Sequence, residues 1–257
     1  MSTRMIVKRL LIQKSILVQS RPSPSTLGSA WRFAFTVPNA FLFAVIFDQQ
    51  IPYERAWIAP HVLKKRLGHF SMKRIASMNP QNLETVIRGD IKGQCLHRFP
   101  RKMSEWLTGA ATKLVNEYEA DARRIWSGRL RARTVLERLE AFPGISQKKA
   151  HMTAAILNEQ EQREFCHASL SGWEEINVAV DVHVRRVWKR AGLGDDLSIT
   201  GIMERASELY PDYPGALDEP LWQIGMFWCK PGQPDCEGAL QNGLECWLED
   251  LCPKILE

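Results

Sequence analysis

The sequence predicts an all-α protein, built as one large domain or as two smaller lobes. Apolar residues recur at three-to-four spacing through most of the chain, short Pro or Gly breaks separate these segments, and no convincing strand alternation competes with them. The 257 residues are enough to bury a substantial core. Hydrophobic residues make up 45% and charged residues 25%, and no apolar run reaches the roughly 18 to 20 residues that a membrane helix needs. We therefore expect a soluble globular protein.

The expected helices follow one another along the chain with short connections. Proline stands at or near several of their starts, where its missing N–H costs nothing. The first four are residues 41–50, 53–66, 80–88 and 100–118. The apolar pattern then continues through Val135, Leu136 and Leu139 to a Phe-Pro-Gly-Ile turn, and a new helix begins after Ser146. Later helices are expected at residues 181–190, 199–209 and 217–228. No internal repeat is visible.

Positive charge is concentrated at the N-terminus. The net charge is +5, and residues 1–47 contain six basic residues and no acidic ones, so the rest of the chain carries +5 minus +6, or −1. Any nucleic-acid surface on the body must therefore be a local patch. The composition of the N-terminal stretch fits a transit peptide, a DNA-contacting arm or a poorly structured extension, and residues 21–25 are typical of a linker.

Four cysteines crowd into the last 29 residues, whereas Cys95 and Cys166 are isolated. The four are Cys229, Cys236, Cys246 and Cys252, in the pattern C-x6-C-x9-C-x5-C. They could form disulfides, bind zinc, ligate a 4Fe-4S cluster or be unrelated buried thiols. No credible secretory signal favours disulfides, and the paired C-x2-C knuckles usual for zinc are absent. A loop with these spacings could wrap a cluster.

A second group of residues lies around the Pro-Gly turn, from Phe142 to Ala150. Such a turn exposes backbone N–H groups at the start of the following helix, and these groups bind anions such as phosphate. Lys148 would stand in the first turn of that helix, where the helix dipole and Lys149 disfavour its charge and favour a neutral, nucleophilic amine. The alternatives are an ordinary helix connector and a solvated lysine that contacts phosphate.

An acidic residue follows an apolar run in the segment from Ala179 to Val187. Asp181 stands there at the start of an expected helix and is followed by His183. A carboxylate at this position could serve in catalysis, but capping the helix is the commonest task of aspartate at such a site.

Together these segments resemble the endonuclease III branch of the helix-hairpin-helix DNA glycosylases, known as HhH-GPD proteins. The turn from Phe142 to Ala150 resembles the family hairpin, the segment from Val180 to Val187 resembles its Val-Asp-x-His motif, and the four cysteines resemble its iron-sulfur loop. Ala44 to Gln50 is similar to the helix end that carries a glutamine in this family. The resemblance covers roughly residues 41 to 257, and four motifs in the same order are more specific than any one of them.

The resemblance implies a two-lobed fold with DNA bound across the cleft. On this basis we expect a basic extension at residues 1–20, a six-helix barrel with the helix-hairpin-helix at residues 41–164, and a terminal lobe with the iron-sulfur loop formed by residues 21–40 and 165–257. Two departures from the family stand out. A polar insertion lies around residues 158–177, which could form a lid, and an enlarged loop from Glu237 to Glu245 separates the middle cysteines.

The family's functional residues map onto this chain residue by residue. The resemblance implies that Lys148 is the catalytic nucleophile and that Asp181 is the catalytic aspartate. It also implies that the four cysteines hold a 4Fe-4S cluster with a structural role. Residues expected to contact DNA are Gln49, Gln50, Gly144, Ser146, Lys149, His183, Arg185 and Arg186, with help from Lys189.

The function implied is base excision from DNA, with associated AP lyase activity by β-elimination. The alternatives are a glycosylase that uses Asp181 with water, a non-catalytic iron-sulfur DNA-binding protein and an electron-transfer protein. We expect a monomer that binds double-stranded DNA containing a lesion or modified base, without membrane association. The location would be cytoplasmic and nucleoid-associated in a prokaryote, or mitochondrial or nuclear in a eukaryote. The sequence does not specify the target base.

Overall fold

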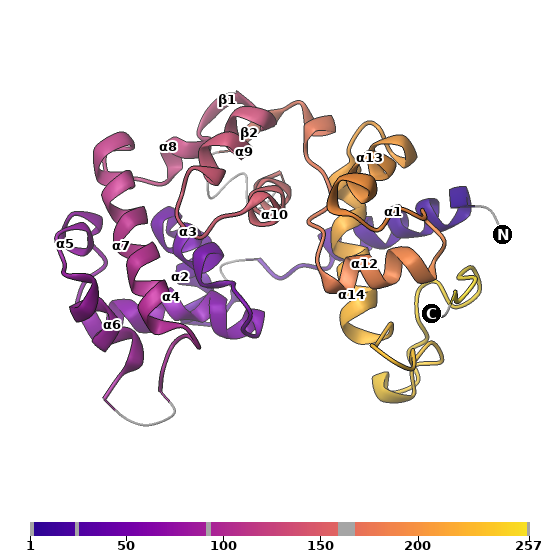
Figure 1. The fold of residues 1–257 in the computed structure, drawn as a ribbon, viewed down its shortest axis with the longest axis horizontal. Helices are drawn as coiled ribbons and strands as arrows, with labels where there is room; N and C mark the ends of the chain where they lie inside the picture. Colours follow the sequence, from indigo (N-terminus) through magenta and orange to yellow (C-terminus); the bar gives the residue numbers. More distant parts are fainter. Residues whose placement is uncertain (1–2, 24–25, 91–93, 159–167, 256–257) are drawn as a thin grey trace. The chain divides into compact units, whose positions relative to one another are not determined.

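The computed structural model describes residues 3–23, 26–90, 94–158 and 168–255 (Figure 1). Its internal contacts divide the chain into two compact units. The terminal unit comprises residues 1–21 and 172–257, and the central unit comprises residues 22–171. The described residues are mainly helical, which confirms the predicted all-α class.

The central unit is a group of helices with one short pair of strands. Its helices are α2 (Ser29–Thr36), α3 (Pro38–Phe47), α4 (Tyr53–Leu67), α5 (Met72–Ala76), α6 (Pro80–Arg88), α7 (Pro100–Glu117), α8 (Arg123–Trp126), α9 (Ala132–Glu140) and α10 (Gln147–Leu157). Its strands are β1 (Gly128–Arg131) and β2 (Ala168–Ser171). Proline at the first turn begins α3, α6 and α7. The starts of α6 and α7 are as predicted, whereas α3 spans Pro38–Phe47 instead of the expected residues 41–50.

Helix α3 forms the centre of this unit. All its residues from Ala40 to Phe47 are fully buried, so the helix is apolar all round instead of amphipathic. Helices α2, α4 and α7 pack around it. No single described helix meets the length and hydropathy expected of a membrane span, although α2 and α3, bent by 106°, do so as a pair by length and composition.

Strands β1 and β2 are a feature that the sequence did not predict. They form a parallel pair from Gly128 opposite Ala168 to Arg131 opposite Ser171. Strand β1 is mostly exposed and carries two arginines among its four residues, so it lacks the apolar alternation by which a half-buried strand is recognised. Strand β2 comes from the predicted insertion, of which residues 159–167, including Cys166 and His167, lie outside the described residues.

The terminal unit brings together the two ends of the chain. It contains α1 (Thr3–Gln19), η2 (Trp173–Glu175), α12 (Val182–Arg190), α13 (Ile199–Leu209), η3 (Pro214–Leu217), α14 (Asp218–Phe227) and η4 (Ala239–Gln241). Its core gathers buried residues from α1, α12, α13 and α14 with Cys229, Cys246 and Leu248 from the last loop. Helices α12 and α14 pack closely together, and α1 packs against α14.

The N-terminal segment is a helix of this core, which differs from the predicted basic extension at residues 1–20. Ile6, Val7 and Leu10 of α1 are buried in the terminal core. The guanidinium of Arg9 forms a bidentate ion pair with Asp250, at 3.1 and 3.0 Å. The N-terminal segment has no acidic residues of its own, and the acidic partner of Arg9 comes from the C-terminal part of the chain.

The contacts also place residues 26–40 and 168–171 in the central unit instead of the predicted terminal lobe, and residues 165–167 of that prediction lie outside the described residues. Residues 22–40 belong to the central unit because α2 packs on α3 and α4, with the ring of Phe35 stacked on that of Trp57 at 4.8 Å. Strand β2 likewise belongs to the central unit through its pairing with β1. These are long-range side-chain and backbone contacts that composition does not reveal.

Candidate functional site

The Pro-Gly turn connects α9 to α10 as predicted. Phe142 and Ile145 are buried on either side of Pro143 and Gly144, and the Ile145 N–H donates to the Phe142 carbonyl oxygen at 3.2 Å. Ser146 is the exposed N-cap of α10, and its carbonyl accepts from the Ala150 N–H at 2.9 Å. The first N–H groups of a helix have no acceptor within the helix, so this end of α10 can bind an anion.

Gly144 is required by the turn for two reasons. Its φ is +80°, a left-handed conformation that favours glycine. A Cβ atom at this position would also lie 2.5 Å from Cε3 of Trp106, closer than side chains approach one another. The conformation of the turn is thus coupled to the Trp106 ring of α7.

Lys148 and Lys149 lie side by side in the first turn of α10 but in different environments. Lys148 is half-buried, whereas Lys149 is only 3% exposed. The Lys149 ammonium donates to the carbonyl oxygens of Ile46 and Gly144, both at 2.9 Å. The pKa of Lys149 is lowered to about 8, mainly by burial; the charge of Asp48 opposes this change and that of Lys148 contributes to it. This buried contact differs from the DNA-binding role predicted for Lys149, because the amine already holds two protein carbonyls.

The predicted glutamines lie just after α3. Gln49 is half-buried and Gln50 is exposed, with a φ of +54° that is unusual for a residue other than glycine. The carbonyl oxygen of Gln49 lies 3.0 Å from Nε2 of the fully buried His97. His97 therefore has a structural contact with the segment that carries the two glutamines.

Asp181 is the N-cap of α12. Its Oδ1 accepts from the backbone N–H groups of His183 at 2.8 Å and Val184 at 2.9 Å. The capping role considered for Asp181 is thus present, and it fixes the orientation of the carboxylate. Lys148 belongs to the central unit and Asp181 to the terminal unit, so their convergence on one substrate stays a prediction.

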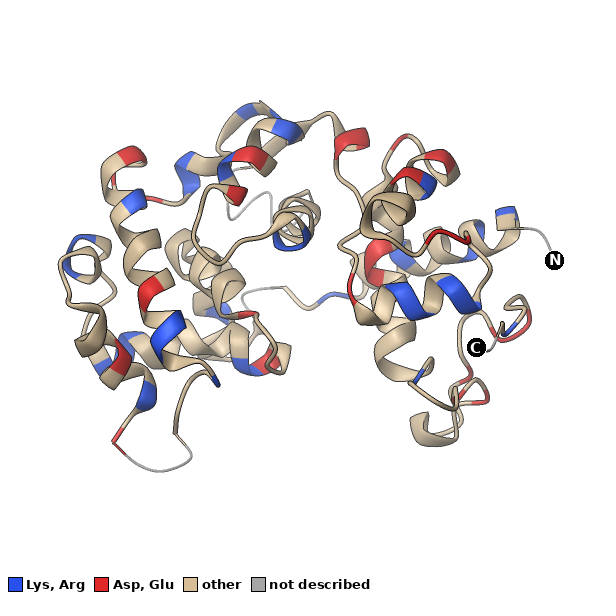
Figure 2. Cartoon of the chain, viewed as in Figure 1, with Lys and Arg blue, Asp and Glu red and all other residues tan. Residues whose placement is uncertain are grey.

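Helix α12 carries several Lys and Arg residues (Figure 2). Their side chains differ in exposure and contacts. Arg185 is exposed. Arg186 donates to the carbonyl oxygens of Cys229 and Gly225, the latter at 2.7 Å, and its Nη2 lies 3.1 Å from Nδ1 of His183. These contacts join α12 to the end of α14, and the DNA contacts expected of Arg186 and His183 stay predictions.

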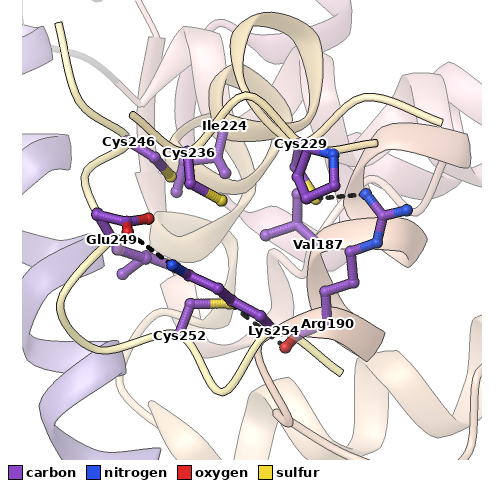
Figure 3. Close-up of a pocket in the computed structure, with 11 residues that line it drawn as sticks. Val187, Arg190, Ile224, Cys229, Cys236, Cys246, Glu249, Cys252 and Lys254 are labelled. Carbon is purple, nitrogen blue, oxygen red and sulfur yellow. Dashed lines mark hydrogen bonds and ion pairs between the residues drawn. The ribbon is translucent and has the colours of Figure 1, made fainter. Parts of the chain in front are cut away.

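The four C-terminal cysteines line one pocket (Figure 3). Val187, Ile224 and Leu248 form part of its apolar wall. The pocket also contains Arg190, whose Nη1 donates to the Cys229 sulfur at 3.4 Å and to the Lys230 carbonyl oxygen at 2.6 Å. The five described cysteines, which are all except Cys166, form no disulfide.

The enlarged loop between Cys236 and Cys246 is a folded structure in its own right. The Asp235 carboxylate accepts from the N–H groups of Ala239 at 2.8 Å and Leu240 at 2.9 Å. The Cys246 N–H donates to the Cys236 carbonyl oxygen at 2.8 Å and closes the loop. The extra residues therefore leave both cysteines facing the same pocket.

Burial makes these thiols reluctant to ionise without a metal. It raises the pKa of Cys246 to about 12 and that of Cys236 to about 11, and it raises the pKa of Cys252. Binding of a metal group would displace the protons and take the sulfurs as thiolates.

The donor set of four thiols is the one that a 4Fe-4S cluster requires. Among the described residues, no three His, Cys, Asp or Glu side chains are grouped to hold one metal ion. The four thiols instead surround a shared space, as the four ligands of an iron-sulfur cluster do.

A comparison with protein families decides what kind of protein carries these features. The model of the HhH-GPD superfamily, described as base excision DNA repair proteins, matches residues 43–212. The chain belongs to the HhH-GPD superfamily. The match includes the hairpin, Lys148 and Asp181, and it ends before the cysteine loop. The comparison with curated protein sequences gave no significant match.

Solved structures share the fold of this HhH-GPD protein. A trapped endonuclease III–DNA covalent intermediate is similar with a TM-score of 0.65 and 17% identity, over 99% of this chain and 97% of the other. A non-covalent endonuclease III–DNA complex has a TM-score of 0.65 and 18% identity over the same shares. A thermostable thymine-DNA glycosylase has a TM-score of 0.61 and 16% identity, over 97% of this chain and 95% of the other.

Beside the HhH-GPD hairpin lies a basic groove that the sequence did not predict. Its lining residues are Arg88, Arg98, Phe99, Pro100, Arg101, Lys102, Glu105 and Trp106. The Lys102 ammonium lies 4.9 Å from the centre of the Trp106 ring, which also touches the turn at Gly144. The signal in the sequence was the basic start of α7, Arg98 to Lys102, next to an aromatic residue.

Proposed function

We propose that this protein is a DNA glycosylase with associated AP lyase activity, acting on a damaged, mismatched or modified base in double-stranded DNA. The observation that carries the proposal is the hairpin itself, in which a phosphate-binding turn is followed at once by Lys148 in the first turn of α10. Membership of a superfamily of base excision repair proteins supports this assignment. One protein of similar fold was solved as a trapped covalent intermediate with DNA, which supports covalent chemistry on this scaffold.

The target nucleotide must leave the duplex before the enzyme can reach its glycosidic bond. Extrusion costs a few kcal/mol, and less for a damaged or mispaired base. The exposed Gln50 and its neighbour Gln49 would fill the vacancy. Backbone N–H groups at the start of α10, near Gly144 and Ser146, would hold a phosphate, with exposed Arg185 as a further contact. These contacts position the DNA without reading the base.

The chemistry follows from an amine and a carboxylate acting at the sugar. Lys148 Nζ attacks C1′ with its lone pair, and the base leaves with the electrons of the glycosidic bond and takes up a proton. The carboxylate of Asp181 stabilises the positive charge that develops at the sugar and accepts a proton from the amine. The nitrogen lone pair then forms the C1′=N bond of a Schiff base as the C1′–O4′ bond breaks, and O4′ takes up the proton held by Asp181. Loss of a proton from C2′ supplies the electrons that form the C2′=C3′ bond, and the 3′ phosphate departs with the electrons of the C3′–O bond.

A glycosylase without strand cutting is the second candidate. In that case water attacks C1′, Asp181 stabilises the charge and Lys148 contacts phosphate. The structural similarity to a thermostable thymine-DNA glycosylase supports this candidate. Both candidates use Asp181 and differ in the attacking atom.

We also propose that Cys229, Cys236, Cys246 and Cys252 hold a 4Fe-4S cluster. The contact from the Arg190 guanidinium to the Cys229 sulfur supports this role, because a donor of this kind stabilises a thiolate ligand. When bound, the cluster would supply a covalent connection between the end of α14 and the last residues of the chain, with no electron required for the reaction.

A panel of duplexes tests the function directly. Each duplex carries one oxidised, deaminated, mismatched or modified base, and cleavage is scored on gels with and without alkali. Base release on at least one duplex, with cutting before alkali treatment, is expected for the bifunctional enzyme. Cutting only after alkali would assign the glycosylase without lyase activity. Asp181→Asn should abolish base release in either case, since asparagine retains the cap and loses the negative charge; unchanged release would contradict the proposal.

A further inference from the structure

The segment that carries the two glutamines is held in a strained conformation. We call residues 48–52 the Gln loop. The Gln50 backbone has a φ of +54°, a left-handed conformation that is unfavourable for a residue with a side chain. The Asp48 N–H donates to the Ala44 carbonyl oxygen at 3.0 Å, and the Gln49 N–H donates to that of Phe47 at 2.7 Å. Strain of this kind persists only where surrounding contacts enforce it.

Two buried side chains contact the backbone of the Gln loop or of the helix end just before it. Lys149 Nζ donates to the Ile46 carbonyl oxygen at 2.9 Å, in the last turn of α3. His97 Nε2 lies 3.0 Å from the carbonyl oxygen of Gln49. Both contacts bridge distant parts of the chain, and both side chains are nearly or completely buried, at 3% and 0% exposure.

The hydrogen bonds of His97 define its tautomer. Its Nδ1 accepts from the Phe99 N–H at 3.1 Å, so Nδ1 carries no proton. Burial lowers the pKa of His97, which favours the neutral ring. The proton of the neutral ring must then be on Nε2, which donates to the Gln49 carbonyl oxygen.

Lys149 also contacts the hairpin. The same ammonium donates to the Gly144 carbonyl oxygen at 2.9 Å, and its Nζ lies 5.8 Å from the centre of the Trp106 ring. One cation therefore joins the turn expected to hold a phosphate to the helix end that carries the Gln loop. A buried charge is a costly way to fill a core position, and here its two hydrogen bonds connect two backbone segments.

We propose that Lys149 and His97 are positioning residues that hold the Gln loop in the conformation needed to fill the vacancy left by an extruded base. The inference rests on the proposed function, since it assigns a task within base extrusion. Lys149 would couple loop insertion to the hairpin, and His97 would fix the carbonyl orientation that sets the strained Gln50 backbone. Neither side chain touches the substrate.

The test measures loop insertion without requiring catalysis. The probe is a duplex with one tetrahydrofuran abasic analogue, which has no base to remove and cannot form a Schiff base, and with 2-aminopurine opposite the analogue. Fluorescence is measured at a protein concentration that binds all of the DNA. A change in signal then reports insertion of the Gln loop and not a change in DNA affinity. Gln50→Ala and Gln49→Ala identify the signal of the inserted side chain. Lys73→Met, at an exposed position on α5 of the same unit, is the matched control.

The variants remove or retain the donors at each position. Lys149→Met and His97→Phe remove them, and each should lower the ratio of inserted to withdrawn loop about tenfold, as expected for loss of one strong buried hydrogen bond. Lys149→Arg and His97→Gln retain donors and should restore most of the signal. Lys73→Met should match the wild type.

Each outcome supports or overturns the inference. Lys149→Met and His97→Phe proteins that fold and give the full signal would overturn it. Should Lys149→Met not fold, His97→Phe decides alone, because it leaves every contact of Lys149 in place. A wild-type protein that produces no signal on the abasic duplex would contradict the proposed function itself, whereas a wild-type signal that both variants retain removes only the positioning role.

Discussion

Replacing Lys149 with methionine tests whether this buried side chain is an ammonium held at a cost. Burial, with help from the charge of Lys148, lowers the pKa of Lys149 from 10.5 to about 8. That difference corresponds to about 3 kcal/mol by which the fold disfavours the charged form. Methionine removes the charge but leaves the carbonyls of Ile46 and Gly144 without this donor, at a cost of about 1 to 3 kcal/mol each. The two effects oppose one another, so we expect the net change in stability at pH 7 to lie between a gain of about 1 kcal/mol and a loss of about 3 kcal/mol.

The pH dependence separates the two effects. Between pH 8 and 10.5 the unfolded chain holds a proton on Lys149 that the folded protein has lost, so this group makes stability rise as pH rises through that window. Below pH 8 both states are protonated and the full penalty is present. From pH 7 to pH 10 the contribution is an increase of about 2.5 kcal/mol in the free energy of unfolding.

Urea unfolding at the two pH values, followed by circular dichroism, measures this contribution. From pH 7 to pH 10, the free energy of unfolding should rise by about 2.5 kcal/mol more in the wild type than in Lys149→Met. The other titrating groups are the same in both proteins and cancel in the difference. The exposed Lys73→Met variant should show the wild-type pH dependence. Equal pH dependence in wild type and Lys149→Met would refute the buried ammonium and its two carbonyl contacts.

Four further substitutions probe other parts of the molecule. Gly144→Ala forces a side chain into a left-handed conformation and against Trp106, so it should destabilise the hairpin by about 2 kcal/mol. It should also weaken binding to a duplex with an abasic analogue in a gel-shift assay, and unchanged affinity would contradict the role of the turn. Asp181→Ala should lose about 1 kcal/mol of stability in thermal unfolding while Asp181→Asn loses almost none, and equal losses would argue against the cap. Leu10→Ala should cost about 2 to 5 kcal/mol, whereas a dispensable N-terminal extension would show no change in urea unfolding. Cys246→Ser should bleach the visible iron-sulfur absorbance, and an intact spectrum would remove this residue from the ligand set.

Local signals in the sequence predicted much of the fold. The start of α6 at Pro80 and that of α7 at Pro100 are as predicted, because proline marks the first turn of a helix. Asp181 also lies where the sequence placed it, at the N-cap of α12. Each of these features depends on neighbouring residues alone.

Features that depend on distant contacts were missed. Lys149 was predicted to contact DNA because it follows a phosphate-binding turn, but its partner Ile46 lies 103 residues away in the chain. Arg186, predicted to contact DNA, contacts the cysteine loop, and so does Arg190 one turn further along α12, for which the sequence suggested no role. A charged side chain can be assigned to the surface or to a buried contact only when the residues that pack against it are known.

The central claim is that the Lys148 amine attacks the sugar with the help of Asp181, and borohydride trapping tests it most directly. A duplex with a natural abasic site, made by removing uracil, is incubated with the protein and sodium borohydride, and the adduct is mapped by peptide mass spectrometry. We predict one covalent protein–DNA adduct at Lys148, absent in Lys148→Ala and strongly reduced in Asp181→Asn. No adduct, or an adduct at another lysine that survives Lys148→Ala, would contradict the mechanism.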